Sequence, residues 1–375
     1  MKKKIVIAHG HSSIEVFHSM IPMILAKYEM PEWKWDFVDY KISNIFQLRG
    51  DLLILIRKYH DGITSDSDIA LELSKLRLNF SKIVYFDDAA AASVVRFAIF
   101  PHVDEYWRRS HLTDTNLYQK EFYGGHLYSN YYHNKFGIED FDQAFINPVV
   151  DDKNNFKKLK LAWNIGIGVY PTNTRSILNR HYLMTRRFIS SMTIIPSIKP
   201  IHMLVLNYIN SMKQELVKEV NLKNRLKKIS SRFLSTSYRN SVGFQRELLI
   251  KKTLEEDLFL SGNISKKEFT KESFRIFGML SPYGWGEICY RDFEAAIAGS
   301  FLIKPDMSHI STWPNIYEQD MYHSILWDLS DIDKLDCIFD QIEVCEQSVY
   351  KTRRRYLDSL NLFTKRCITM IDHLV

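Results

Sequence analysis

The stretch SPYGWGEICYRDFEAAIAGSFLIKPDM, residues 281–307, decides the fold class of this chain. Its first six residues include two glycines and predict a loop, which leads into a segment with helical spacing. Glu287, Arg291 and Glu294 recur at intervals of four and three residues, so they are expected on one face of that helix. Gly299 is placed to end the helix, and the apolar run after it predicts a buried strand. Together these elements predict one nucleotide-binding crevice.

The first part of the chain alternates between short apolar runs and segments with helical spacing. The runs at 4–8, 51–56 and 82–86 predict buried strands separated by helices. This alternation predicts a parallel sheet covered on both faces, as in a Rossmann-like domain over residues 1–155. The aromatic segment 118–142 shows little periodicity and is predicted to be a long surface loop.

A second domain is expected after a polar linker at 151–158. We expect it to span residues 156–345, with terminal helices at 346–375 that pack back on the first domain. The crevice predicted from the signature stretch belongs to this second domain. Its other predicted elements are a helix at 201–220, a strand at 228–236, a helix at 242–254 and a final helix pair at 332–355 and 359–374.

Length and charge limit the classes of protein to consider. The 375 residues suit two domains of ordinary size, and 50 basic against 44 acidic side chains give a net charge of +6. Basic residues concentrate at 157–160, 213–228 and 351–355. Such runs are usually solvated faces, but they can also attract anionic lipid headgroups. No nucleic-acid recognition motif is present, and we expect no nucleic-acid partner.

Cysteine usage and hydropathy indicate where the protein works. The four cysteines form no C-x-x-C pair, which argues against a zinc site and a disulfide framework. The apolar run after Met1 is too short for a signal peptide, and no window approaches 18 uninterrupted apolar residues. We expect a cytoplasmic protein, with the inner face of the cytoplasmic membrane as a place of peripheral contact.

The signature stretch resembles the donor-binding half of GT-B glycosyltransferases. FEAAIAGSFLI, residues 293–303, matches the second half of the two-glutamate motif of the large retaining branch. Gly286 stands at the aligned position of the first glutamate, and Glu287 follows one residue later. The longer pattern S-P-x-G-x-G-E-x-x-x-R-D-x-E-A, followed by K-P-D-M-S-H, is similar to bacterial surface-polysaccharide (group 1-like) glycosyltransferases. The resemblance covers about residues 225–335.

This resemblance implies a fold and a reaction. The fold is α/β, with two Rossmann-like domains that face each other across a cleft. The second domain would bind a nucleotide-sugar donor and the first a glycan or lipid-linked acceptor of surface-polysaccharide biosynthesis, with no cofactor and no metal. Because Glu287 is offset, a retaining outcome is not carried over. The alternatives are a nucleotide-sugar epimerase or hydrolase on the same fold, and a non-catalytic protein that binds glycan or nucleotide.

The resemblance also assigns roles to the two glutamates of the stretch. Glu294 would accept hydrogen bonds from the donor ribose, since a carboxylate accepts two at once. Glu287 would contact hydroxyls of the donor sugar. The structural alternatives are a surface glutamate paired with Arg291 for the first, and a glutamate at a helix N-terminus for the second.

Phosphate groups of the donor need positive charge and N–H donors. The backbone N–H groups of the predicted loop are expected at the helix N-terminus, with Arg239 or Arg246 near the phosphates and Lys304 as a weaker candidate. Asp306 and His309 follow the next strand, where a loop-capping role is an equal alternative. The complete set of predicted donor-binding residues is Arg239, Arg246, Ser281, Tyr283, Gly284, Gly286, Glu287, Arg291, Glu294, Lys304, Asp306 and His309.

Catalytic candidates also stand at strand ends of the first domain. His9 and His11 follow the first strand, and Asp87 and Asp88 follow the strand at 82–86. In a parallel sheet such positions face the ligand crevice, where a base could deprotonate an acceptor hydroxyl. Their structural alternative is to cap the following helices. Glu287 completes the catalytic candidates.

Overall fold

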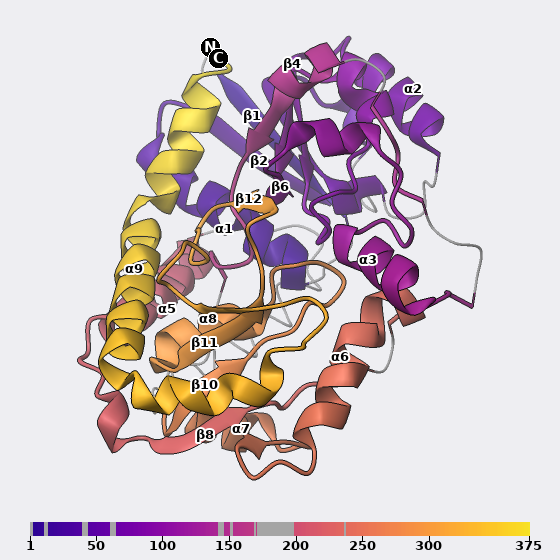
Figure 1. The fold of residues 1–375 in the computed structure, drawn as a ribbon. Helices are drawn as coiled ribbons and strands as arrows, with labels where there is room; N and C mark the ends of the chain where they lie inside the picture. The colour runs from indigo at the N-terminus through magenta and orange to yellow at the C-terminus, as the bar shows by residue number, and fades with distance from the viewer. Residues whose placement is uncertain are drawn as a thin grey trace.

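The computed structural model in Figure 1 shows two α/β halves joined along one side by a long C-terminal helix. It describes residues 3–10, 14–39, 44–60, 65–141, 146–150, 153–168, 170, 199–235 and 238–375. Among these residues, no helix is long and apolar enough to cross a membrane.

The N-terminal half is built on a parallel sheet. Within the described residues it has six strands in the order β2-β1-β3-β4-β5-β7. The central strands are almost wholly apolar and buried, as strands covered on both faces must be. Its strands are β1 (Lys4–His9), β2 (Lys34–Asp39), β3 (Gly50–Ile56), β4 (Phe80–Asp87), β5 (Glu105–Arg108) and β7 (Leu159–Leu161), and its helices are α1 (Ile14–Glu29), α2 (Asp66–Leu76) and α3 (Leu127–Phe136).

The C-terminal half repeats this design on a smaller scale. Its described sheet has five parallel strands in the order β13-β11-β10-β8-β9. α7 begins at a capping box made by Ser265 and Glu268, and α8 ends where Gly299 adopts a left-handed conformation. The strands are β8 (Leu226–Ser230), β9 (Phe259–Leu260), β10 (Ile276–Leu280), β11 (Phe301–Pro305) and β13 (His323–Ile325), and the helices are α5 (Lys199–Leu216), α6 (Asn240–Thr253), α7 (Lys266–Ser273), α8 (Tyr290–Ala298) and α9 (Ile342–Asp372).

Both sheets have the same topology. Numbered within each half, the first five strands lie in the order 2-1-3-4-5, a doubly wound arrangement in which the order reverses between strands 1 and 3. Ligands of such sheets bind outside the carboxyl ends of the strands at that reversal. In the C-terminal half the reversal lies between β8 and β10, so the loop at 281–289 leaves the sheet at this point. The predicted fold class of two Rossmann-like α/β domains is confirmed.

A β-ribbon and a long helix are among the contacts that hold the halves together. A two-stranded antiparallel ribbon pairs β6 (Ser110–Leu112) of the N-terminal half with β12 (Ile310–Thr312) of the C-terminal half. The 31-residue helix α9 packs on α1, α5 and α8 and brings the C-terminus beside the N-terminus (Figure 1). Tyr356 and Arg366 of this helix donate to the carbonyls of Gly166 and Ala162, at 2.6 and 2.9 Å.

Several predicted boundaries are wrong. β7 is the last strand of the N-terminal sheet, so this sheet extends beyond the boundary expected at residue 155. The segment 118–142 contains α3, whose tyrosine-rich sequence hides its helical period. The predicted final helix pair is a 3-10 segment (Ile332–Asp340) followed by the single helix α9, because no breaking residue separates 355 from 359. β2, β9 and β13 are strands that the sequence pattern did not indicate.

Arg353 on α9 fixes the ends of two helices. Its guanidinium is buried and donates to the carbonyls of Ala296 and Ile297 at the end of α8, and to those of Glu215 and Lys218 at the end of α5. The carbonyls of Ala296 and Glu215 also accept from the N–H groups of Gly299 and Lys218, so Arg353 adds a second donor at both helix ends. Burial lowers the pKa of Arg353 to about 10.

We expect Arg353→Met to lower the free energy of unfolding by about 3 kcal/mol, because it removes the four hydrogen bonds that the buried guanidinium donates to these carbonyls. Arg354→Met is the matched control. The Arg354 side chain is 63% exposed, so its replacement should lower the free energy of unfolding by less than about 0.5 kcal/mol. Urea unfolding of both variants measures the difference. Equal midpoints for the two would contradict the structural role of Arg353.

Candidate functional site

A cavity of about 660 Å³ lies between the two halves. Its volume is typical of sites for nucleotides and other small ligands. The N-terminal half contributes residues from α1, from the loop after β4 and from the turn between β5 and β6. The C-terminal half contributes residues from α6, α7, the loop at 281–289 and α8. The lining residues are Glu15, His18, Ala90, Arg109, Ser110, Asn164, Ile165, Tyr170, Tyr238, Arg246, Lys266, Gly284, Trp285, Gly286, Ile288, Cys289, Tyr290, Arg291 and Glu294.

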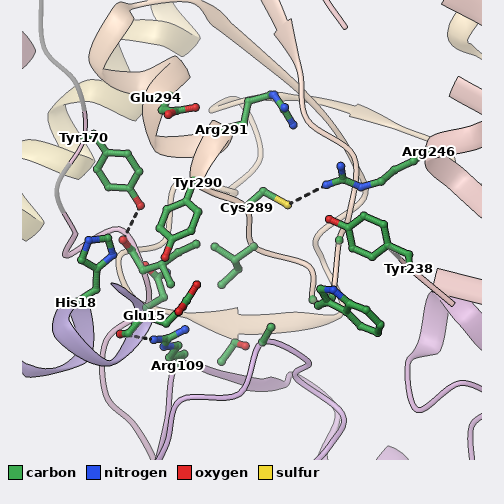
Figure 2. Close-up of a pocket in the computed structure, with 18 of the residues that line it drawn as sticks. Glu15, His18, Arg109, Tyr170, Tyr238, Arg246, Cys289, Tyr290, Arg291 and Glu294 are labelled. Carbon is green, nitrogen blue, oxygen red and sulfur yellow. Dashed lines mark hydrogen bonds between the residues drawn. The ribbon is translucent and has the colours of Figure 1, made fainter. Parts of the chain in front are cut away.

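Glu294 and Arg291 reach the cavity from α8 (Figure 2). Glu294 forms an ion pair with Lys266 of α7, and its side chain is only 13% exposed whereas that of Lys266 is 61% exposed. Arg291 donates to the carbonyl of Arg232 at 2.7 Å, and its guanidinium lies 5.6 Å from the ring centre of Phe233. Burial lowers the pKa of Arg291, and the nearby Glu294 partly offsets this effect. The predicted helix therefore brings both side chains to one cavity.

Arg246 of α6 faces the same cavity beside the loop. Its Nε donates to the carbonyl of Tyr283 at 2.5 Å and its Nη1 to that of Leu234 at 3.0 Å. Its remaining nitrogen, Nη2, lies 4.0 Å from the Cys289 sulfur. This geometry fixes the guanidinium, and Figure 2 shows its hydrogen bond to the Cys289 sulfur across the cavity wall.

A second, smaller recess of about 250 Å³ adjoins the cavity. The two share the side chains of Lys266, Arg291 and Glu294. The recess adds the ring of Phe269 and the apolar side chain of Ile264, together with Arg232, Gly262 and Asn263. A ligand held by Glu294 could thus extend in two directions, into the recess and into the main cavity.

On the N-terminal side, Arg109 anchors the cavity wall. Its Nη2 donates to the Ser19 hydroxyl at 2.8 Å and to the carbonyl of Glu15 at 3.0 Å, and it lies 3.3 Å from the Asp88 carboxylate. Glu15 and His18, both on α1, are further titratable lining groups of this half. The four lining cations thus outnumber the two lining carboxylates.

The predicted donor-binding residues separate into two groups. Arg246, Gly284, Gly286, Arg291 and Glu294 line the cavity. Others form the support beneath it: the buried Lys304 lies 3.1 Å from Asp292 and donates to the carbonyl of Ser281. The residues that do not line the cavity are Arg239, Ser281, Tyr283, Glu287, Lys304, Asp306 and His309.

Two expectations about the signature loop are wrong. α8 begins at Tyr290, with Cys289 as its N-cap, so Glu287 lies in the loop and not on the helix face. The N–H groups of Tyr283 and Gly284 are used within the half, since they donate to the Gln245 side chain and to the carbonyl of Gly286. Asp292 takes the N3 position of a capping box, which moves the start of the helix three residues later than the glutamate pattern suggested.

Glu287 is a buried contact between the two halves. Its carboxylate accepts from the backbone N–H of Ala92 at 3.1 Å and lies 3.7 Å from Nε2 of His309. Burial acts to raise the pKa of Glu287, but His309 and His126 outweigh it and hold the pKa below its usual value. The resemblance predicted that Glu287 contacts the donor sugar. In the structure it instead connects the loop at 281–289 to the N-terminal half.

Asp87, Asp88 and His9, three catalytic candidates of the N-terminal half, are not among the residues that line the cavity. Asp87 accepts from the Tyr106 hydroxyl at 2.5 Å and lies 2.6 Å from the fully buried Arg108. The carboxylate of Asp88 lies against Arg109, which itself lines the cavity. Burial lowers the pKa of His9, and His9 does not line the cavity. His11 is outside the described residues. A role as the base that deprotonates the acceptor remains a prediction for His9, His11, Asp87 and Asp88.

Sequence reasoning missed much of the lining. Glu15, His18, Arg109, Lys266 and Trp285 are in the cavity wall but were not proposed as site residues. The rule that polar residues after parallel strands face a ligand would have found Arg109, which follows β5 directly. The lining by α1 depends on how the two halves face each other, which no local pattern encodes.

Comparisons with known proteins give similarity of fold only. No family profile matches the chain, and no curated protein matches it in sequence. Similar solved structures include an alpha-glucosyltransferase in complex with UDP, at 9% identity and a TM-score of 0.41, over 99% of this chain and 100% of that chain. The S. aureus MnaA–UDP structure has 12% identity and a TM-score of 0.43, over 99% and 96%. A glycosyltransferase from Rickettsia africae ESF-5 has 8% identity and a TM-score of 0.49, over 100% and 98%. These values are too low to assign a reaction or a substrate to this chain.

We expect Asp87→Asn to destabilise the protein by about 3 to 5 kcal/mol, because it leaves the buried Arg108 without its counter-charge. Glu255→Gln, which neutralises an exposed carboxylate, should change the free energy of unfolding by less than about 0.5 kcal/mol. Thermal unfolding measures both. An Asp87→Asn protein with unchanged stability but no activity would instead support the catalytic role predicted from sequence.

Proposed function

We propose that this chain is a glycosyltransferase that transfers a sugar from a nucleotide-sugar to a glycan or lipid-linked acceptor of surface-polysaccharide biosynthesis. The observation that carries the proposal is the set of lining charges. Arg109, Arg246, Lys266 and Arg291 surround one cavity with Glu294 at its wall, where the strand order of the C-terminal sheet reverses. Such a cavity suits a ligand with negative charges and hydroxyl groups, which describes a sugar nucleotide.

The nucleoside half of the donor would lie beside α8. The Glu294 carboxylate can accept two hydrogen bonds from the vicinal hydroxyls of a ribose. The recess next to it offers Phe269 and Ile264 as apolar surface for the base and Asn263 as a polar group for its edge. In this arrangement Lys266 orients the carboxylate of Glu294 and also adds positive charge to the cavity.

The diphosphate would then enter the main cavity. Arg246 and Arg291 present guanidinium groups there, and charge that develops on the leaving phosphate is stabilised by fixed cations. We propose that these side chains neutralise the leaving group without a divalent cation. Transfer that continues at full rate in EDTA would agree with this, and transfer restored only by Mg²⁺ would contradict it.

The acceptor would approach from the N-terminal half. Glu15 projects from α1 into the cavity and is suited to accept the proton of an acceptor hydroxyl in an inverting reaction (Figure 2).

Peripheral contact with an anionic membrane is part of the proposal, because Lys223 and Lys227 are exposed beside Leu226. The test is flotation of the protein with anionic vesicles. If the variant in which both lysines are replaced by glutamate floats as the wild type does, the proposed membrane contact is contradicted. No nucleic acid is included among the proposed partners.

We expect Glu294→Ala to abolish the thermal stabilisation that the correct nucleotide gives. A ligand at about 100 times its dissociation constant stabilises the folded state by roughly 2.7 kcal/mol. The panel contains uridine, guanosine and cytidine diphosphates and their sugars, with UDP first because it is present in two of the similar structures. Lys266→Ala is the matched control: it removes the ion pair but keeps the carboxylate, so part of the stabilisation should remain.

Equal loss in both variants would indicate that Glu294 acts only as the partner of Lys266. No stabilisation of the wild type by any nucleotide would contradict the proposed function and favour a non-catalytic protein. With the nucleotide known, its release is measured with and without acceptor saccharide. A transferase releases it only when acceptor is present, whereas an epimerase or hydrolase turns the donor over alone.

A further inference from the structure

Trp285 is the exposed member of the chain's tryptophans. All seven lie in described parts of the chain, and Trp285 alone among them is classed with the exposed large apolar residues, at 50% of its surface. Trp285 also lines the cavity between the two halves. A half-exposed indole in the wall of a ligand cavity is a surface suited to binding.

The exposure of this indole is not the result of a loose loop. The Tyr128 hydroxyl donates to the carbonyl of Gly284 at 2.8 Å, and Nε2 of His126 lies 3.2 Å from the carbonyl of Trp285. Gly286 packs so closely on the carbonyl of Ala90 that a Cβ atom would not fit. The backbone on both sides of Trp285 is therefore held by the N-terminal half, and the indole is presented from a fixed position.

A second aromatic ring lies beside the indole. The ring centres of Tyr238 and Trp285 are 5.3 Å apart, with a tilt of 41°. The guanidinium of Arg246 lies 4.8 Å from the centre of the Tyr238 ring, and Arg246 lines the same cavity. Aromatic faces next to a hydrogen-bond donor match a pyranose ring, which has an apolar C–H face and hydroxyl groups at its edge.

We propose that Trp285 and Tyr238 form a subsite for a pyranose ring of the acceptor saccharide, an assignment that rests on the transferase function proposed above. The indole and phenol faces bind the C–H face of the sugar. The subsite thereby adds an acceptor-binding surface on the C-terminal half, which was expected to serve the donor.

The position of the pair favours the acceptor over the nucleoside. In Figure 2, Tyr238 and Glu294 lie on opposite sides of the cavity, with Arg291 and Cys289 between them. A ribose held by Glu294 has the Phe269 recess beside it for its base. The Tyr238 side is thus left for the far end of a bound donor and for the sugar that receives the transferred group.

The subsite is tested by nuclear magnetic resonance of the protein labelled with ¹⁵N at the tryptophan indoles. The signal of Trp285 is the one that disappears in Trp285→Phe. Trp327 is the internal control, because its indole N–H already donates to the Tyr283 hydroxyl at 3.0 Å and it does not line the cavity. Methyl glycosides of glucose, galactose, mannose and N-acetylglucosamine are titrated in both anomers, and nucleoside diphosphates are titrated separately.

We expect at least one glycoside to shift the Trp285 signal in a saturable way while the Trp327 signal stays in place. Tyr238→Ala should raise the dissociation constant of that glycoside about tenfold. Tyr238→Phe should bind it with the affinity of the wild type, because the ring face and not the hydroxyl makes the contact. Thermal unfolding of each variant checks that it is folded.

The outcomes separate this subsite from the proposed function. A Trp285 signal that no glycoside shifts overturns the subsite, and nucleotide stabilisation through Glu294 would still leave the transferase function in place. A Trp285 signal shifted by a nucleoside diphosphate and by no glycoside assigns the aromatic pair to the donor and also overturns the subsite. A response to glycosides without any nucleotide binding overturns the acceptor assignment together with the transferase function.

Discussion

The contact between Glu287 and the N-terminal half is the constraint on which the rest of the site depends. The carboxylate accepts from the N–H of Ala92, and one residue earlier Gly286 lies against the carbonyl of Ala90. Through these contacts the loop at 281–289 is bound to both sheets at once. The loop starts where β10 ends, and α8 starts where the loop ends. The position of Glu294, Arg291 and Trp285 relative to α1 is therefore set by a few buried polar contacts.

The buried cations near the loop and α8 are also tied to polar partners. Arg246 and Arg353 each donate to backbone carbonyls, and Lys304 is paired with Asp292. Buried charges that are paired and fully hydrogen-bonded can be kept in a protein interior, and they fix geometry at the same time. Arg246 has both roles, since it donates to the carbonyl of Tyr283 in the loop and also lines the cavity with Arg291 and Lys266.

The sequence predicted the fold class because short apolar runs alternate with helical periods. The strands that it did not indicate are very short or carry several charges, such as β9 with two residues and β2 with charged residues at three of its six positions. The predicted helix face was correct for Arg291 and Glu294 but not for Glu287, since the capping box at Cys289 and Asp292 competes with the glutamate spacing. Asp87 and Arg109 show a second limit of sequence-based prediction. Their positions at strand ends can be recognised from the sequence, but the direction of each side chain depends on the ion pair that it forms in the folded protein.

The most direct measurement of the central claim, that a nucleotide binds where the C-terminal sheet reverses its strand order, is hydrogen–deuterium exchange with and without the stabilising nucleoside diphosphate. The structure predicts slower exchange in the loop at 281–289 and in α8, and no change in α2, which lies away from the cavity lining. Unchanged exchange in the loop and in α8, with protection in another part of the chain, would contradict this placement of the site.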